Sequence, residues 1–122
     1  MIAIRTIVTD VAAARDFYVT HLGFSVKQEW GPVAVLEGHG IEVWLSGPAS
    51  SAGKTPIDGH AAAPGGSNRL ALVVPDVAAK IASLKNAGVR FGCDVVNGPG
   101  GTWIVILDPS GNPVELFQPA AR

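Results

Sequence analysis

The sequence predicts an α+β fold made of two βαβββ modules, because its two halves repeat one pattern. In each half a strand-like apolar run precedes an Asp-Val-Ala-Ala segment, at residues 10–13 and 76–79, that opens a helical stretch. A later apolar strand in each half carries a single glutamate, Glu42 or Glu115. Two packed copies of one unit would bring these glutamates near a shared centre, so the repeat predicts a site.

The bulk composition fits one globular domain that associates with a second copy. The chain has 122 residues, of which 48% are hydrophobic and 16% are charged. A charged fraction below the usual quarter predicts that part of the apolar surface is covered by another subunit. We therefore expect a homodimer.

Charge and cysteine content exclude several classes of partner. The net charge of −1 and the lack of a basic stripe argue against nucleic acid, and no apolar run is long enough for a membrane span. Cys93 is the single cysteine, which excludes an internal disulfide and a cysteine-rich zinc site. We expect Cys93 to be buried, as free cysteines usually are. We expect the protein to be cytoplasmic, since residues 1–10 do not resemble a signal peptide.

The first half is expected to hold one strand, one helix and three further strands. Alternation along residues 2–8 places Ala3 and Arg5 on the same face. Asp10 should cap the helix with its carboxylate, and Gly23 should end it. The three strands that follow are expected at residues 25–29, 33–36 and 41–45.

Residues 46–68 break the pattern, because they are rich in Gly, Pro, Ala and Ser and have no apolar periodicity. Loops of this length are usually linkers or functional lids. The segment joins the two repeats, so both interpretations stay open. The chain is thus divided into a first module (1–45), this segment and a second module (69–122).

The second half repeats the order. A strand is expected over residues 69–74, and Asp76 should cap the next helix. The apolar stripe of that helix consists of Val77, Ile81 and Leu84. Further strands are expected at residues 91–96, 103–107 and 113–118. In each half one helix covers one face of a curved sheet, which leaves the other face for packing or for a ligand.

Three groups of residues carry a family resemblance. They are Thr9-Asp10 with Phe17-Tyr18 and Leu22-Gly23-Phe24, then Asp76-Val77 with Ala87-Gly88-Val89, then Asp108-Pro109-Ser110-Gly111-Asn112-Pro113-Val114-Glu115-Leu116. Together they resemble the vicinal oxygen chelate superfamily, which includes glyoxalase I, bleomycin-resistance proteins and extradiol dioxygenases. The resemblance spans nearly the whole chain. It implies a cupped mixed sheet, with sites often at a dimer interface, and says less about activity.

The resemblance also implies where a metal would bind. Metal-dependent members take a ligand, usually His, from each first strand and another, usually Glu, from each last strand. These positions fall on Ala3 and Arg69, and on Glu42 and Glu115. A methyl group and a guanidinium offer no lone pair to a metal, so we predict no metal cofactor. The alternative is a divalent metal held by the two glutamates with His60 or water.

Alternation places two cations, two carboxylates and two rings on the faces away from the helices. They are Arg5, Arg69, Glu42, Glu115, Trp44 and Phe117. In one interpretation the arginines and glutamates neutralise each other, because a buried carboxylate needs a partner. In the other, an arginine binds an anionic group of a ligand, and Glu115 or Glu42 acts as a general base whose pKa is raised by apolar surroundings.

Aromatic residues add candidates for ligand contact. Trp44 shares a face with Glu42 and is the first candidate for stacking on a flat ligand, with core or interface packing as the alternative. Phe117 and Trp103 are further candidates, and Trp30 lies beside a turn where it could line a rim.

These features predict a small-molecule-binding protein similar to the bleomycin-resistance branch, which sequesters or carries a planar or anionic compound. In this hypothesis the aromatic residues contact the ligand, and Arg5 or Arg69 orients its polar groups. The alternatives are enzymes. One is a metal-dependent lyase or isomerase of the glyoxalase type. The other is a metal-free isomerase that uses Glu115 or Glu42 as a proton shuttle while an arginine stabilises an enolate.

Overall fold

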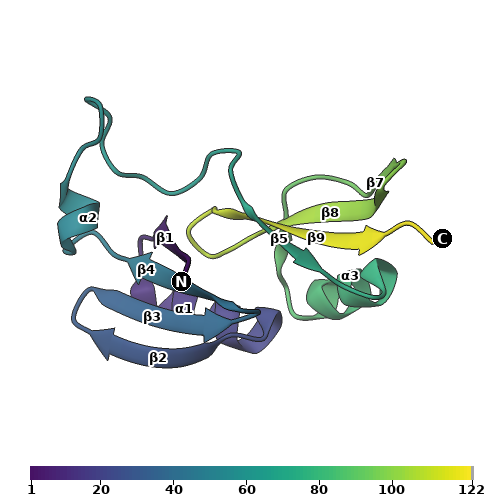
Figure 1. Ribbon diagram of the computed structural model, residues 1–122, viewed down its shortest axis with the longest axis horizontal. Helices are drawn as coiled ribbons and strands as arrows, with labels where there is room; N and C mark the ends of the chain where they lie inside the picture. Colours follow the sequence, from purple (N-terminus) through teal and green to yellow (C-terminus); the bar gives the residue numbers. More distant parts are fainter. Residues whose placement is uncertain (122) are drawn as a thin grey trace. The chain divides into compact units, whose positions relative to one another are not determined.

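The computed structural model describes residues 1–121 and consists of two units, Met1–Gly65 (unit 1) and Gly66–Arg122 (unit 2). Each unit holds one β-sheet with a helix of at least ten residues against one of its faces (Figure 1). The sheets have four and five strands, so the predicted α+β fold is confirmed. No helix within residues 1–121 is long and apolar enough to cross a membrane.

Unit 1 follows the βαβββ order and ends in a short helix. Its elements are β1 (Ala3–Ile7), α1 (Val11–Leu22), β2 (Ser25–Trp30), β3 (Val33–Gly38), β4 (Ile41–Ser46) and α2 (Ser51–Lys54). The strands lie in the order β1-β4-β3-β2, with β1 parallel to β4 and the other neighbours antiparallel. The first strand of the unit therefore lies beside its last strand.

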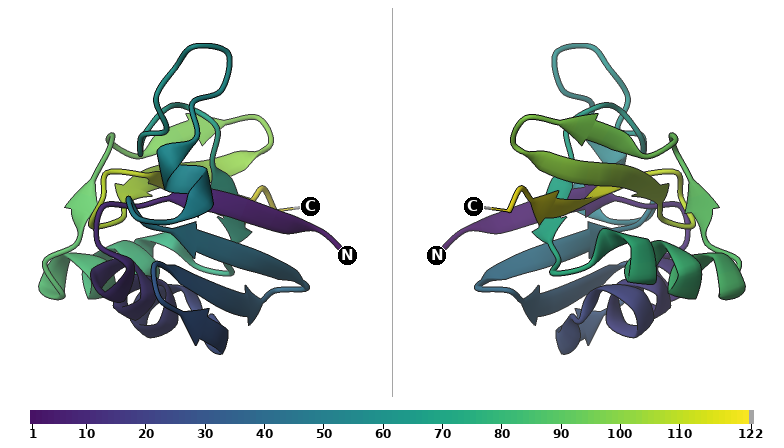
Figure 2. Two further views of the ribbon diagram at one scale, coloured as in Figure 1. Left: turned by 90° about the vertical axis from the view of Figure 1, so that its left-hand side faces the viewer. Right: turned by 90° about the vertical axis from the view of Figure 1, so that its right-hand side faces the viewer.

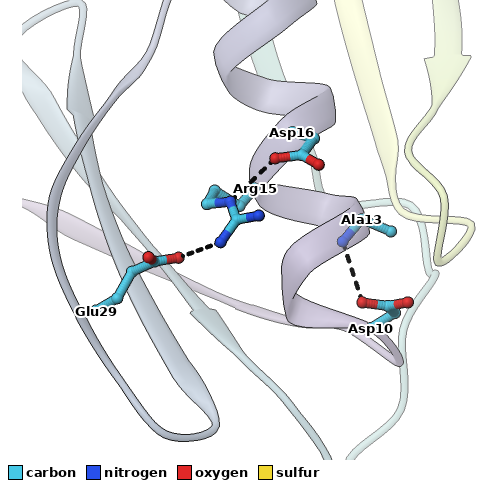
Figure 3. Close-up of polar contacts among 5 residues, drawn as sticks. All are labelled: Asp10, Ala13, Arg15, Asp16 and Glu29. Atoms are coloured by element: carbon cyan, nitrogen blue, oxygen red, sulfur yellow. Dashed lines mark hydrogen bonds and ion pairs between the residues drawn. The ribbon is translucent and has the colours of Figure 1, made fainter.

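Helix α1 begins and ends where the sequence predicts. The side chain of Asp10 accepts a hydrogen bond of 3.0 Å from the backbone N–H of Ala13 (Figure 3), and Gly23 takes the left-handed conformation with φ 73°. Arg15 donates to Glu29 of β2 over 2.8 Å, as Figure 3 also shows. The hydrogen bond to Glu29, and after it the one to Asp16, raises the pKa of the Arg15 guanidinium. This pair ties the outer side of α1 to β2.

The core of unit 1 lies between α1 and the sheet. Figure 2 shows α1 along one face of β3 and β4. The side chains buried on this side come from one stripe of the helix and from alternate strand positions: Ala14, Phe17, Tyr18, Leu22, Ala34, Leu36, Val43 and Leu45. Because strand side chains alternate, the residues between them point to the opposite face of the sheet. That opposite face carries the polar groups described below.

Unit 2 repeats the βαβββ order, except that two short strands stand in place of the first strand after the helix. Its elements are β5 (Leu70–Val73), α3 (Val77–Asn86), β6 (Arg90–Phe91), β7 (Val96–Gly98), β8 (Gly101–Leu107) and β9 (Pro113–Pro119). The strands lie in the order β5-β9-β8-β6, β7 pairs with β8, and β5 is parallel to β9. Asp76 caps α3 by accepting from the N–H of Ala79 over 3.0 Å, as predicted.

The single strand predicted over residues 91–96 is wrong. Phe91 pairs with Ile106 and Val96 pairs with Trp103, so the two segments use positions of β8 that are closer together than Phe91 and Val96 are in sequence. The residues between them must therefore loop out. Cys93 lies in this loop and is exposed, which corrects the expected burial.

Candidate functional site

In unit 1 the sheet face away from α1 gathers the residues predicted there. The register of β1 against β4 pairs Ala3 with Glu42 and Arg5 with Trp44. Neighbouring residues on paired strands share a face. Arg5, Glu42 and Trp44 therefore form one polar and aromatic cluster, and Ala3 adds only a methyl group to it.

Arg5 stacks on Trp44 and has a neutral hydrogen-bond partner. Its Cζ atom lies 5.0 Å from the centroid of the indole ring, and Nη1 donates to the hydroxyl of Ser46 over 3.0 Å. Within unit 1, Met1–Gly65, no carboxylate forms an ion pair with Arg5. Glu42, the glutamate of the same sheet face, therefore does not neutralise this arginine. Its guanidinium keeps donors that a ligand can use.

Glu42 is neutralised by Lys27, a residue that no motif of the sequence singles out. Glu42 is 8% exposed, and its Oε2 lies 2.5 Å from the ammonium of Lys27. The indole N–H of Trp44 donates to Oε1 over 2.9 Å. The hydrogen bond from Lys27, and after it the one from Trp44, holds the pKa of the Glu42 carboxyl below its usual value. This is the opposite direction from the one a general base at neutral pH needs. A catalytic role for Glu42 stays a prediction.

Lys27 lies at a β-bulge on the face of Glu42. In the pairing of β2 with β3, Val26 faces Leu36 and Gln28 faces Val35, so Lys27 is the extra residue. Val26 and Leu36 lie on the face of α1, so alternation directs Lys27 to the opposite face. The bulge brings Gln28 to that face as well, and no pattern in the sequence marks it.

The cluster lines a hollow of about 360 Å³. Its lining residues are Arg5, Lys27, Gln28, Trp30, Val33, Val35, Glu42, Trp44 and Ser51. The volume lies within the range of ordinary small-molecule sites. Trp30 is 51% exposed, which leaves part of its surface open to solvent. We call this space the tryptophan hollow.

A second hollow of about 530 Å³ adjoins the first and shares Arg5 and Ser51 with it. Its other lining residues are Ile7, Ala52, Thr55, Ile57, His60, Ala61, Ala62 and Ala63. We call this space the alanine hollow. Most of its lining comes from residues 46–68, the segment expected to be a linker or a lid.

Two local structures shape that segment. Ser50 caps α2: its hydroxyl donates to the carbonyl of Gly47 over 2.6 Å and accepts from the N–H of Gly53 over 3.0 Å. Further on, Ile57 and His60 exchange two backbone hydrogen bonds of 2.9 Å around Asp58-Gly59, which both have positive φ. An Asp-Gly pair is the sequence signal of such a turn, and it could have predicted this one.

In unit 2 an arginine also lies over an indole ring, with a different balance of charge. Arg69 lies over Trp103, with Cζ 5.4 Å from the ring centroid, and its Nη2 lies 2.9 Å from Oε1 of Glu115. Trp103 pairs with Phe117 across β8 and β9, so both rings share the face of Glu115. Here arginine and glutamate do neutralise each other.

The residues at the ligand positions do not fit a divalent metal. Glu42 is held by Lys27 and Trp44, and Glu115 is held by Arg69. Neither Ala3 nor Arg69 has a lone pair to donate. Within residues 1–121 no three His, Cys, Asp or Glu side chains are grouped as a metal site requires.

Two of the histidines contact aromatic rings, and the third lines a hollow of unit 1. Nε2 of His39 lies 2.6 Å from the carbonyl oxygen of Leu22, and its ring meets Phe24 edge to face. His21 meets Phe17 in the same way. His60 lines the alanine hollow, while Glu42 lines the tryptophan hollow.

Comparison with known proteins places the chain among relatives of this architecture. A family model described as the Glyoxalase/Bleomycin resistance protein/Dioxygenase superfamily matches residues 2–116. No curated protein sequence matches the chain. TnmS3, an antibiotic binding protein from Streptomyces sp. CB03234, is 28% identical with a TM-score of 0.72, over 97% of this chain and 93% of that chain.

Two further solved structures extend the comparison. A superfamily member from Sphaerobacter thermophilus DSM 20745 is 27% identical with a TM-score of 0.71, over 95% of this chain and 94% of that chain. A lactoylglutathione lyase from Agrobacterium tumefaciens has a TM-score of 0.77 at 18% identity, over 97% of this chain and 92% of that chain. The last likeness shows the fold alone.

Proposed function

The chain belongs to the glyoxalase/bleomycin resistance protein/dioxygenase superfamily, and we propose that it is a member that binds, without a metal, a flat and negatively charged organic compound in the tryptophan hollow. In this proposal the protein sequesters or carries the compound. The ring of the ligand stacks on Trp44 or Trp30, and its acidic group meets Arg5.

The environment of Arg5 carries the proposal. The carboxylate beside it, Glu42, is already paired with Lys27, while the hydrogen-bond partner of Arg5 is the hydroxyl of Ser46. The hollow thus holds one cation more than its own carboxylate neutralises. Guanidinium groups bind carboxylates through paired hydrogen bonds, and indole rings offer a flat apolar surface next to them.

The likeness to TnmS3, an antibiotic binding protein, supports the binding of a small molecule by a chain of this fold. The alternative is an isomerase or lyase of the glyoxalase type. A metal-dependent enzyme would need donors that Ala3 and Arg69 lack. A metal-free isomerase would need a base, and the hydrogen bonds that lower the pKa of Glu42 disfavour it, which leaves Glu115 as the remaining candidate.

The test compares matched anionic and neutral compounds. Tryptophan fluorescence is followed while 3-phenylpropanoate or 3-phenylpropanamide is added, and the compound is then recovered and analysed. We expect the carboxylate to bind at least tenfold more tightly, because a hydrogen bond to a charged group contributes about 1.5–3 kcal/mol. Recovery of unchanged compound would support sequestration. Equal affinities, no binding or chemical conversion would each contradict the proposal.

Association of two chains and a cytoplasmic location stay predictions. Several apolar side chains are exposed, among them Ile2 at 70% and Val73 at 64%. An apolar surface of this kind is commonly covered in an oligomer. Sedimentation velocity of the purified chain would measure its mass, and a monomer at all accessible concentrations would rule out the homodimer.

A further inference from the structure

Arg5 stands at the junction of two hollows of different chemistry. It lines both the tryptophan hollow and the alanine hollow, and the other residue common to both is Ser51. A carboxylate held by Arg5 would therefore have open space on two sides. A ligand with a single ring fills one side and leaves the other empty.

The two sides call for different groups. The tryptophan hollow offers two indole rings together with Lys27, Gln28 and Glu42. The alanine hollow offers Ala52, the run Ala61 to Ala63 and two isoleucines, and it contains no carboxylate. Methyl groups and short branched chains make an apolar wall that suits an aliphatic chain.

Resting on the binding function proposed above, we infer that the ligand is a carboxylic acid with two arms. The carbon that bears the carboxylate joins an aromatic arm to an aliphatic arm. The carboxylate meets Arg5, the aromatic arm enters the tryptophan hollow, and the aliphatic arm enters the alanine hollow. N-acylated aromatic amino acids are one class with this arrangement. Ser51, the uncharged residue shared by both hollows, suits the amide link of such a compound.

The fixed shape of the alanine hollow makes the aliphatic arm selective for length. Its walls are held by the α2 cap at Ser50 and by the turn at Asp58-Gly59, each closed by hydrogen bonds. Affinity should therefore rise with chain length until the hollow is filled and should then stop rising. Each buried methylene should raise the affinity about three- to fourfold.

Calorimetric titration of the full chain tests this with N-acetyl-, N-butanoyl- and N-hexanoyl-L-phenylalanine, and with 3-phenylpropanoate as the ligand that lacks the second arm. The expected result is a stepwise rise in affinity along the acyl series. If 3-phenylpropanoate binds and chain length changes nothing, the two-armed inference is overturned and the binding function stands. If no member of the set binds, the binding function itself fails.

A matched pair of variants locates the second arm. Ala62→Phe fills the alanine hollow and should reduce the affinity for the hexanoyl compound to that for the acetyl compound. Ala12→Phe changes an exposed alanine of α1, on the other side of the sheet. The affinities of this variant for the acyl series should equal those of the original protein. A chain-length effect that survives Ala62→Phe in a folded protein would place the arm elsewhere and overturn the inference. Thermal unfolding of both variants checks that they fold.

Discussion

The guanidinium of Arg5 lies over the indole ring of Trp44 and has no carboxylate partner within unit 1. In unit 2, Arg69 lies over Trp103 in the same manner but forms an ion pair with Glu115. The two arginines do not occupy equivalent positions of the repeat, because Arg69 matches Ala3 when each is counted from its helix cap. Each unit thus has an arginine on an indole ring, and only Arg5 lacks a carboxylate partner within its own unit.

Arg5→Gln should weaken the binding of 3-phenylpropanoate about 10- to 100-fold, because it removes hydrogen bonds to a charged group. Arg5→Lys should recover part of this loss, since it keeps the charge but not the planar fork. Titration calorimetry measures both. Arg15→Gln on α1 is the control and should bind normally. An equal loss for 3-phenylpropanamide would show that Arg5 acts through structure instead of through its charge.

Lys27→Met should flatten the dependence of stability on acid pH. The folded-state pKa of Glu42 is lowered, so its stabilising contribution is present above the unfolded pKa of about 4.3 and is lost as the pH falls through the folded pKa. The variant should be less stable than the original protein near neutral pH and should differ from it least in strong acid. Urea unfolding between about pH 3 and pH 7 measures this.

The control for that change is Lys54→Met, which alters a lysine of α2 that has no ion-pair partner within residues 1–121. Its pH profile should run parallel to that of the original protein. Parallel profiles for Lys27→Met as well would mean that the Lys27–Glu42 pair contributes nothing to stability.

Removal of metal should change neither stability nor binding. Lys27 and Arg69 occupy the two carboxylates that a metal would use, so dialysis against EDTA should leave the unfolding midpoint and the affinity for 3-phenylpropanoate as they were. Elemental analysis of protein purified without chelator provides the control. About one transition-metal ion per chain, with activity that depends on it, would favour the lyase alternative.

Loss of either helix cap should cost about 1 kcal/mol of unfolding free energy. Asp10→Ala removes the acceptor for the N–H of Ala13, and Asp76→Ala removes the acceptor for the N–H of Ala79. Asparagine keeps an acceptor oxygen, so Asp10→Asn and Asp76→Asn should retain most of the stability. Chemical unfolding compares the four variants. Equal losses for alanine and asparagine would contradict capping as the cause.

Gly53→Ala should destabilise helix α2, which lies beside the site. A methyl group at Gly53 would overlap the carbonyl oxygen of Gly47, and such overpacking costs about 1–3 kcal/mol. Binding in both hollows should weaken, because Ser51 of α2 lines both. Gly100→Ala, where nothing lies within 4 Å of the added methyl, should stay within about 0.5 kcal/mol of the original protein.

Local signals account for what the sequence predicts of the fold. Asp10 and Asp76 mark helix starts, and Gly23 marks a helix end, because capping depends on neighbouring residues alone. Alternation likewise places Arg5 and Trp44 on one face of the unit 1 sheet, since side-chain direction in a regular strand is fixed.

The features that the sequence does not predict depend on how strands pair. Alternation gives the face on which Lys27 lies, but its distance from Glu42 depends on the order and register of β2, β3 and β4. Cys93 lies in the loop between two short strands that pair with nearby positions of β8. Strand order and register are relations between distant residues, which no local pattern records.

The parallel pairing of β1 with β4 sets the order in which the site can form during synthesis. Residues 3–7 leave the ribosome before residues 41–46, with which they pair. Arg5 and Trp44 can therefore meet only after β4 has emerged. A compound that contacts both residues binds only the sheet in which β1 and β4 are paired. Such a compound would therefore raise the folded fraction of the newly made chain by mass action.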